Sequence, residues 1–151
     1  MVHPTTPGTH PGAVGSATRG THQKLALAIG AVFLLVGLAG FLVTGFDGFT
    51  GHDHGQTLLG FAVNPLHNIV HILIGVLGLA MWKTSDSART YGWILFVVYT
   101  LTFVYGLVVA NDEEANLLNI NGADNVLHIL SALAGLAIAL WPRKGADRTS
   151  R

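Results

Sequence analysis

Four apolar blocks of nearly membrane-spanning length decide which folds are open to this chain. They cover residues 25–44, 58–82, 91–110 and 126–141, and the first and third contain neither a charged residue nor a histidine. A helix of about 20 residues matches the ~30 Å hydrocarbon core of a bilayer. Only 11% of the 151 residues are charged, whereas a soluble domain carries roughly 25%. We therefore predict an all-α protein, a transmembrane four-helix bundle with no soluble domain.

The basic residues of the chain fall on one side of these four blocks. All eight Lys and Arg lie before the first block, between the second and third, or after the fourth: Arg19, Lys24, Lys83, Arg89, Arg143, Lys144, Arg148 and Arg151. The other two loops contain acidic residues and no Lys or Arg. The positive-inside rule then predicts a multi-pass protein of the plasma membrane with both termini in the cytoplasm.

Three parts of the chain are expected from these patterns. Residues 1–22, rich in Pro, Gly, Thr and His, are predicted to form a disordered cytoplasmic tail whose histidines (His3, His10 and His22) are solvated. Residues 23–142 form the four-span membrane domain, with spans at about 25–44, 64–82, 91–110 and 122–141. Residues 143–151 form a basic cytoplasmic tail. The absence of cysteine excludes disulfides and Cys-based metal sites within the chain.

Two polar octets precede the apolar parts of the second and fourth spans and resemble each other. Residues 64–71 read Asn-Pro-Leu-His-Asn-Ile-Val-His, and residues 121–128 read Asn-Gly-Ala-Asp-Asn-Val-Leu-His. Two Asn and one His align at one fixed offset, and His67 aligns with Asp124. This repetition predicts two tandem, pseudo-repeated helical hairpins related by an axis along the membrane normal.

Part of each octet is explained by the chemistry of helix starts. Asn64 is a preferred N-cap and Pro65 suits the first helical position. Asn121 with Asp124 predicts a capping box, with Asp in place of Glu. These residues are therefore expected to begin the second and fourth helices at the outer membrane interface.

The remaining polar residues of the octets form the candidate site. At about 100° per residue, the polar side chains of each octet share one helical face, and polar groups at this depth usually face the bundle interior. We assign a cofactor-binding cluster to His67, Asn68, His71, Asp124, Asn125 and His128. We expect His71 and His128 to meet near the axis, with Asn68 and Asn125 beside them and His67 near Asp124.

Several readings of this cluster stay open from the sequence. It forms a structural hydrogen-bond network between helices, or it binds haem, a divalent metal, a quinone or a lipid headgroup, or it relays protons. The pattern selects no cofactor, and no catalytic residue or dedicated metal site is assigned. The trio His52-Asp53-His54 is read as a polar loop, the aromatic residues of the third block (Phe96, Tyr99, Phe103 and Tyr105) as packing residues, and the small residues of the spans as helix-packing faces.

The octets and their flanking residues also carry a resemblance to a known family. Residues 58–71, the Ala-Arg-Thr-Tyr stretch at 88–91, and residues 117–128 resemble a family of small actinobacterial-type integral membrane proteins catalogued as a domain of unknown function. The resemblance covers about residues 24–141. It implies a four-helix membrane protein and implies no activity.

We expect a non-enzymatic accessory or scaffold protein of the membrane. Its partners would be the lipid bilayer and either further copies of itself or a larger membrane complex, with no nucleic acid. The alternative is a membrane-embedded site for haem, metal or quinone that uses the histidines of spans two and four, with electron transfer as one role.

Overall fold

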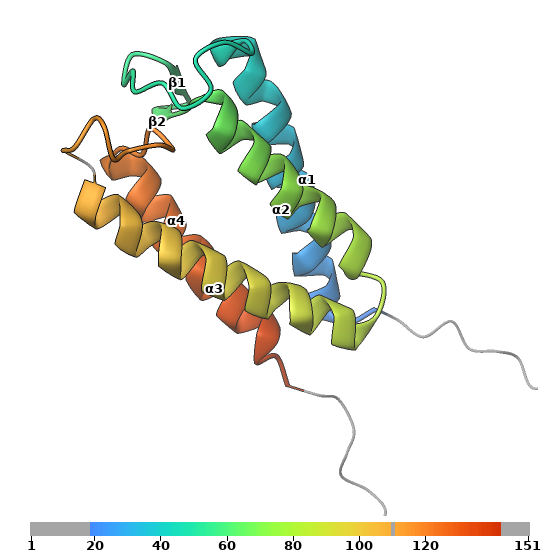
Figure 1. Cartoon of the computed structure of the whole chain (residues 1–151). Coiled ribbons are helices and arrows are strands. Elements are labelled where there is room, and N and C mark those ends of the chain that lie inside the picture. The colour runs from blue at the N-terminus through green and yellow to red at the C-terminus, as the bar shows by residue number, and fades with distance from the viewer. Residues whose placement is uncertain (1–18, 110, 143–151) are drawn as a thin grey trace, which may run out of the picture.

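A computed structural model describes residues 19–109 and 111–142 of the chain (Figure 1). It contains four helices, α1 (Thr21–Thr44), α2 (Pro65–Met81), α3 (Ser85–Val109) and α4 (Gly122–Ala139). A two-stranded antiparallel sheet, β1 (Thr57–Leu58) with β2 (Phe61–Ala62), lies in the loop between α1 and α2. α1 packs along α2 and α3 packs along α4. The predicted all-α bundle of two tandem hairpins is therefore confirmed.

Three of the four helices, α1, α3 and α4, are long and apolar enough to cross a membrane. α2 is also apolar but has 17 residues, which is the lower limit for a membrane span. At 1.5 Å per residue, α2 extends about 25 Å along α1. Length and composition thus support a helical membrane protein. That α2 also crosses the membrane stays a prediction.

Glycines bring the two helices of each hairpin into direct backbone contact. A Cβ on Gly78 of α2 would lie 2.7 Å from the Cα of Gly30 on α1, and a Cβ on Gly135 of α4 would lie 2.7 Å from the carbonyl oxygen of Gly92 on α3. In lipid, such close approach replaces the hydrophobic effect as the source of helix association. These small residues pack inside the hairpins, as predicted.

Three of the helices, α1, α3 and α4, start earlier than their apolar blocks do. α3 begins at Ser85 rather than at residue 91 because Thr84 caps it, its Oγ1 accepting a hydrogen bond from the Ser87 amide at 3.2 Å. α1 begins at Thr21, two residues before the predicted start of the membrane domain at residue 23. His22 is not solvated: it is buried in α1, with its Nε2 2.9 Å from Ser85 Oγ. Residues 1–18, with His3 and His10, lie outside the described residues, as does the basic tail at 143–151.

Side chains close the end of the bundle where α2 and α4 finish. Gln23 donates from Nε2 to the carbonyls of Trp82 (3.2 Å) and Lys83 (2.9 Å). Arg89 donates to the carbonyls of Ala139 (2.8 Å) and Trp141. These bonds satisfy carbonyls that have no partner within their own helices. The guanidinium of Arg19 lies 4.0 Å from the centre of the Trp82 ring.

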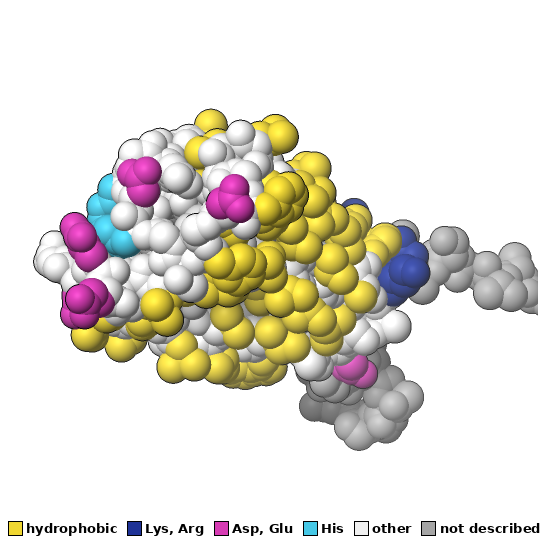
Figure 2. Space-filling model, turned by 45° about the horizontal axis from the view of Figure 1, so that its top comes forward, with side chains coloured by type: hydrophobic (Ala, Val, Ile, Leu, Met, Phe, Trp, Pro, Cys, Tyr) yellow, Lys and Arg dark blue, Asp and Glu magenta, His cyan; other side chains and the backbone are white. Residues whose placement is uncertain are grey.

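Charge divides the molecule into two ends. The end just described, with Arg19, Lys24, Lys83 and Arg89, is the basic end. The acidic end consists of the loops at 45–64 and 111–121, which carry Asp47, Asp53, Asp112, Glu113 and Glu114. Figure 2 shows most acidic side chains gathered at one end, dark blue Lys and Arg with one acidic side chain at the other, and a hydrophobic surface between them. The apolar middle flanked by charge is the pattern expected of a bundle in a bilayer.

Candidate functional site

The octets begin α2 and α4 as the sequence predicts. Asn64 Oδ1 accepts a hydrogen bond from the His67 amide at 2.8 Å, with Pro65 at the first helical position. Asn121 Oδ1 accepts from the Asp124 amide at 3.0 Å, and Asp124 Oδ2 accepts from the Asn121 amide at 2.9 Å. The second pair is a complete capping box.

The same cap residues bind the two loops of the acidic end together. Asn64 donates from Nδ2 to the Leu117 carbonyl at 2.9 Å, and Asn121 donates from Nδ2 to the Gly60 carbonyl at 3.1 Å. The amide of Ala62 on β2 donates to Asp124 Oδ2 at 3.1 Å. Each loop is thus held by the first turn of the opposite hairpin, and together the loops cover the buried ends of α2 and α4.

Two further asparagines support this cover, and sequence reasoning missed their role. Asn119 donates from Nδ2 to the carbonyls of Asp53 (2.9 Å) and Val63 (3.1 Å), and its φ of 54° lies in the left-handed region that Asn tolerates. Asn116 exchanges two bonds with Ile120, at 2.8 and 2.9 Å. Both side chains are fully buried. The available signal in the sequence was the occurrence of two asparagines, three residues apart, directly before the second octet.

Three histidines meet beneath this cover. His67 and His71 come from adjacent turns of α2, and His128 comes from α4. All three are buried, and each offers a ring nitrogen within 4.8 Å of those of the other two. The Nε2 atoms of His67 and His71 lie 3.2 Å apart. The expected meeting of His71 and His128 occurs, and His67 is the third member of the histidine cluster, as we call His67, His71 and His128.

Backbone and aromatic groups fix the orientation of these rings. Nδ1 of His67 donates to the Leu118 carbonyl at 3.0 Å, so its Nε2 faces His71. Phe33 of α1 packs edge-on against His71, with ring centroids 5.1 Å apart, and stacks on Tyr99 of α3, also at 5.1 Å. The ring centroids of Tyr99 and His128 are in turn 5.5 Å apart. All four helices therefore contribute to the surroundings of the cluster, and Tyr99 is a packing residue of the core, as predicted.

Asn68 and Asn125 face the preceding helix of their own hairpin. Asn68 packs on Gly40 of α1 and donates to Thr44 Oγ1 at 3.0 Å, while Asn125 packs on Gly106 of α3. In both places a Cβ on the glycine would collide with the asparagine side chain. These two asparagines thus repeat one structural relationship in the two hairpins, and the expected arrangement beside the histidines at the axis is not what they adopt.

Asp124 is the last of the predicted site residues, and the trio His52-Asp53-His54 was predicted to be a polar loop. Oδ2 of Asp124 serves the two backbone amides described above, while its Oδ1 is buried without a hydrogen-bond partner among the described residues. Asp124 is not a member of the histidine cluster. In the trio His52-Asp53-His54, Asp53 Oδ1 accepts from the Gly55 amide at 2.8 Å, and the two histidine rings lie 4.4 Å apart. The trio belongs to the polar loop between α1 and α2 and is not part of the histidine cluster.

The fold and the buried polar centre define a helical membrane protein built from two antiparallel hairpins. The chain belongs to the family described as a domain of unknown function, DUF4383, whose family model matches residues 23–141. The expected membership of a family catalogued as a domain of unknown function is thereby confirmed. No curated protein and no solved structure matches the chain.

Proposed function

We propose that this protein binds one divalent transition-metal ion at His67, His71 and His128, inside its membrane domain. The observation that carries the proposal is the convergence of three buried imidazoles whose nitrogens lie within 4.8 Å of one another. Imidazole nitrogen is a preferred ligand of zinc, copper, nickel and iron. The role of the protein would be to hold such an ion at the membrane.

The distance within α2 suits two ligands of one ion. Nitrogens bound at 2.0–2.1 Å to a tetrahedral zinc lie about 3.3 Å apart, and the two Nε2 atoms of His67 and His71 are separated by 3.2 Å. Without metal, the Nε2–H of His71 donates to the Nε2 of His67, because the other nitrogen of His67 already carries its proton toward Leu118. A metal ion would replace this shared proton.

The surroundings have features that support metal ligands elsewhere. The bond from His67 Nδ1 to the Leu118 carbonyl is the kind of outer contact that orients a metal-bound histidine. Asp124 is a fully buried acidic residue one turn before His128, so its carboxylate would partly offset the charge of a cation. Three protein ligands would leave one position of a tetrahedral ion for water or a small anion.

A bare ion suits this packing better than a haem or a quinone does. The ring centroids of His67 and His71 are 4.5 Å apart, and those of His71 and Phe33 are 5.1 Å apart. A macrocycle or quinone ring placed among them would have to separate helices that are already in contact. An ion needs only small rotations of the rings.

A second candidate is the accessory or scaffold role expected from the sequence. It is favoured by the many atoms of the octets that cap helices and join loops, since Asn64, Asn121 and Asp124 have sufficient structural roles. In this role the histidine cluster would be a hydrogen-bonded packing element. The protein would then act through association with further copies or with a larger membrane complex.

The orientation that we propose follows from the two charged ends. The basic end would lie in the cytoplasm with both termini, and the acidic end would lie outside the plasma membrane. The histidine cluster, one to two turns below the outer loops, would then be nearer the outer face. An ion would reach it from that side, past the acidic loops.

Metal content of the purified protein tests the proposal. The full chain, with an affinity tag free of histidine, is loaded with zinc in detergent, separated from unbound ion and analysed for bound zinc. We expect one equivalent more zinc in the unmodified protein than in His71→Gln or His128→Gln. His54→Gln, which changes an exposed histidine of the outer loop, is the matched control and should retain the full amount.

The result decides between the two candidates. Equal zinc in all four proteins, with unchanged helical circular dichroism, would overturn metal binding and leave the scaffold role. Circular dichroism also shows whether a variant has lost zinc only because it has unfolded.

A further inference from the structure

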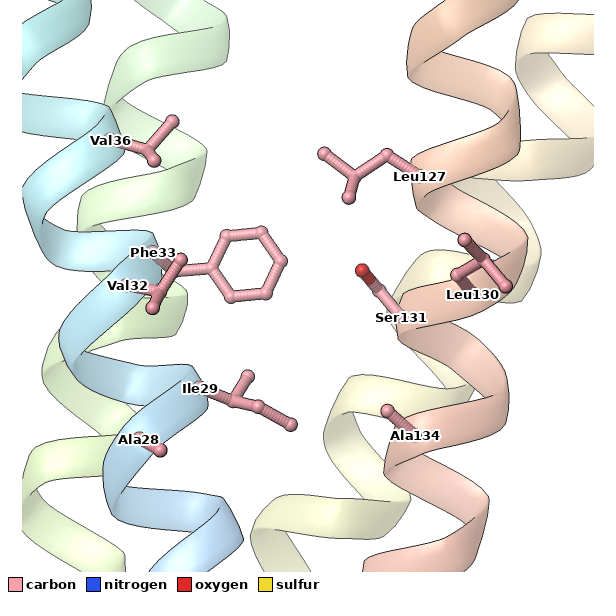
Figure 3. A pocket seen from close by; sticks show the side chains of 9 residues that line it. All are labelled: Ala28, Ile29, Val32, Phe33, Val36, Leu127, Leu130, Ser131 and Ala134. Carbon is pink, nitrogen blue, oxygen red and sulfur yellow. The ribbon is translucent and has the colours of Figure 1, made fainter.

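An apolar cavity of about 320 Å³ lies between α1 and α4, where the two hairpins face each other. Figure 3 shows side chains of the two helices pointing toward each other across it, with Phe33 on one side and Ser131 on the other. Its lining consists of hydrocarbon side chains except for the hydroxyl of Ser131. No charged side chain lines it, so its chemistry favours a hydrocarbon occupant.

The cavity lies at the depth of the membrane interior. Its lining residues occupy positions 28–36 of α1 and 127–134 of α4, and both helices are long and apolar enough to cross a bilayer. Val32 and Leu130 line the cavity and are also 58% and 56% exposed on the outside of the bundle. The cavity is therefore continuous with the surface that lipid chains cover.

We propose that one acyl chain of a bilayer lipid occupies this cavity and separates the two hairpins. An empty apolar cavity loses the dispersion contacts of its lining atoms, and the neighbouring fluid at this depth is hydrocarbon. The volume lies at the low end of the ~300–1,000 Å³ range of ligand pockets. A helix of a second copy, about 10–12 Å across with its side chains, is too wide for it.

The bound chain would contact Phe33, which also packs on His71. This ring is the wall between the cavity and the histidine cluster. The proposal stands on the volume, depth and lining of the cavity, and it does not rest on metal binding by the cluster.

Photolabelling in a bilayer tests the occupant. The full chain is reconstituted in phosphatidylcholine vesicles containing a small fraction of phosphatidylcholine with a diazirine at mid-chain, irradiated, and mapped by peptide mass spectrometry. We expect Phe33, Leu127 and Ser131 to be labelled several-fold more than Val104, a residue of α3 that is 51% exposed and does not line the cavity. Equal labelling of the two groups would overturn the proposal.

Variants that fill the cavity give the second arm. Ala134→Phe places a ring in the cavity and should lower labelling of Phe33 and Leu127 to the level of Val104. Val97→Phe, a similar enlargement on the exposed face of α3, is the control and should change nothing. The thermal midpoint shows whether Ala134→Phe folds, and Ser131→Leu replaces it if it does not. Undiminished labelling in the filled variant, or cross-links that join two copies at these residues, would contradict an acyl chain.

Discussion

His67 and His71 lie on adjacent turns of α2 with their Nε2 atoms 3.2 Å apart, both buried beneath the loops of the acidic end. The other nitrogen of His67 is held by the Leu118 carbonyl of the opposite hairpin. One ring of this pair is thus fixed by α2 and by the loop before α4 together. Burying two imidazoles in a membrane domain is costly unless they have partners, and this cost is the physical reason to seek a function for them.

Replacement of Asp124 by Asn should weaken metal binding while keeping the shape of the side chain. The substitution removes a buried negative charge one turn before His128, and the weaker attraction for a cation should lower the metal affinity. Competition with a zinc indicator measures the effect. Asp53→Asn, in a loop of the acidic end, is the control. An affinity unchanged in Asp124→Asn would show that this carboxylate does not support the ion.

Replacement of Gly40 by Ala should destabilise the bundle. The added Cβ collides with Asn68, and overpacking of this kind costs about 1–3 kcal/mol. The double variant Gly40→Ala, Asn68→Ala should unfold at a higher temperature in detergent than Gly40→Ala alone, because the collision is removed.

Gly122→Ala is the control for this pair. No atom lies within 4 Å of a Cβ at Gly122, so stability should change by less than about 0.5 kcal/mol. The double variant's loss of unfolding free energy should be smaller than the sum of the losses in Gly40→Ala and Asn68→Ala. If it equalled that sum, the contact between Gly40 and Asn68 would be contradicted.

Substitutions of Asn64 separate its two roles. Asn64→Ala loses the cap, which is worth about 0.5–2 kcal/mol, and also the bonds from Nδ2 to Leu117 and Gly51. Asn64→Asp keeps an oxygen for the His67 amide and loses only the donor. The unfolding temperature in detergent should therefore be highest for the unmodified protein, lower for Asn64→Asp and lowest for Asn64→Ala. The reverse order of the two variants would show that the cap contributes less than the repulsion between oxygens.

The proposed orientation can be read from single cysteines, since the chain has none of its own. His54→Cys places a thiol in the loop of the acidic end, and Lys83→Cys places one at the basic end; both positions are exposed. In intact cells, a membrane-impermeant maleimide should label position 54 directly and position 83 only after permeabilisation. The opposite pattern would show that the protein has the inverse orientation. Labelling of both positions in intact cells would show that α2, which lies between them, does not cross the membrane.

The two hairpins and the starts of α2 and α4 could be predicted from sequence because their causes are local. Apolar blocks, cap residues and the repeated octet each act over a few residues, and Asn64, Asn121 and Asp124 occupy the predicted cap positions. α3 starts before its apolar block because a polar first turn capped by Thr84 can extend beyond the hydrophobic part of a span.

The arrangement around the site depended on which helix each polar face contacts. Periodicity placed Asn68 and His71 on one broad face, but that face is wide enough to contact two neighbours. Asn68 packs on Gly40 of α1, whereas His71 reaches His67 and Phe33. The contributions of Phe33 and Tyr99 could not be read from sequence, because both occur in apolar blocks where an aromatic residue carries no distinguishing signal.

X-ray absorption of the zinc-loaded protein tests the central claim most directly, because it counts the ligands of the ion. The three-histidine site predicts about three imidazole nitrogens at 2.0–2.1 Å from zinc, falling to about two in His128→Gln. A spectrum dominated by oxygen ligands, or one that does not change in His128→Gln, would contradict metal binding at the histidine cluster.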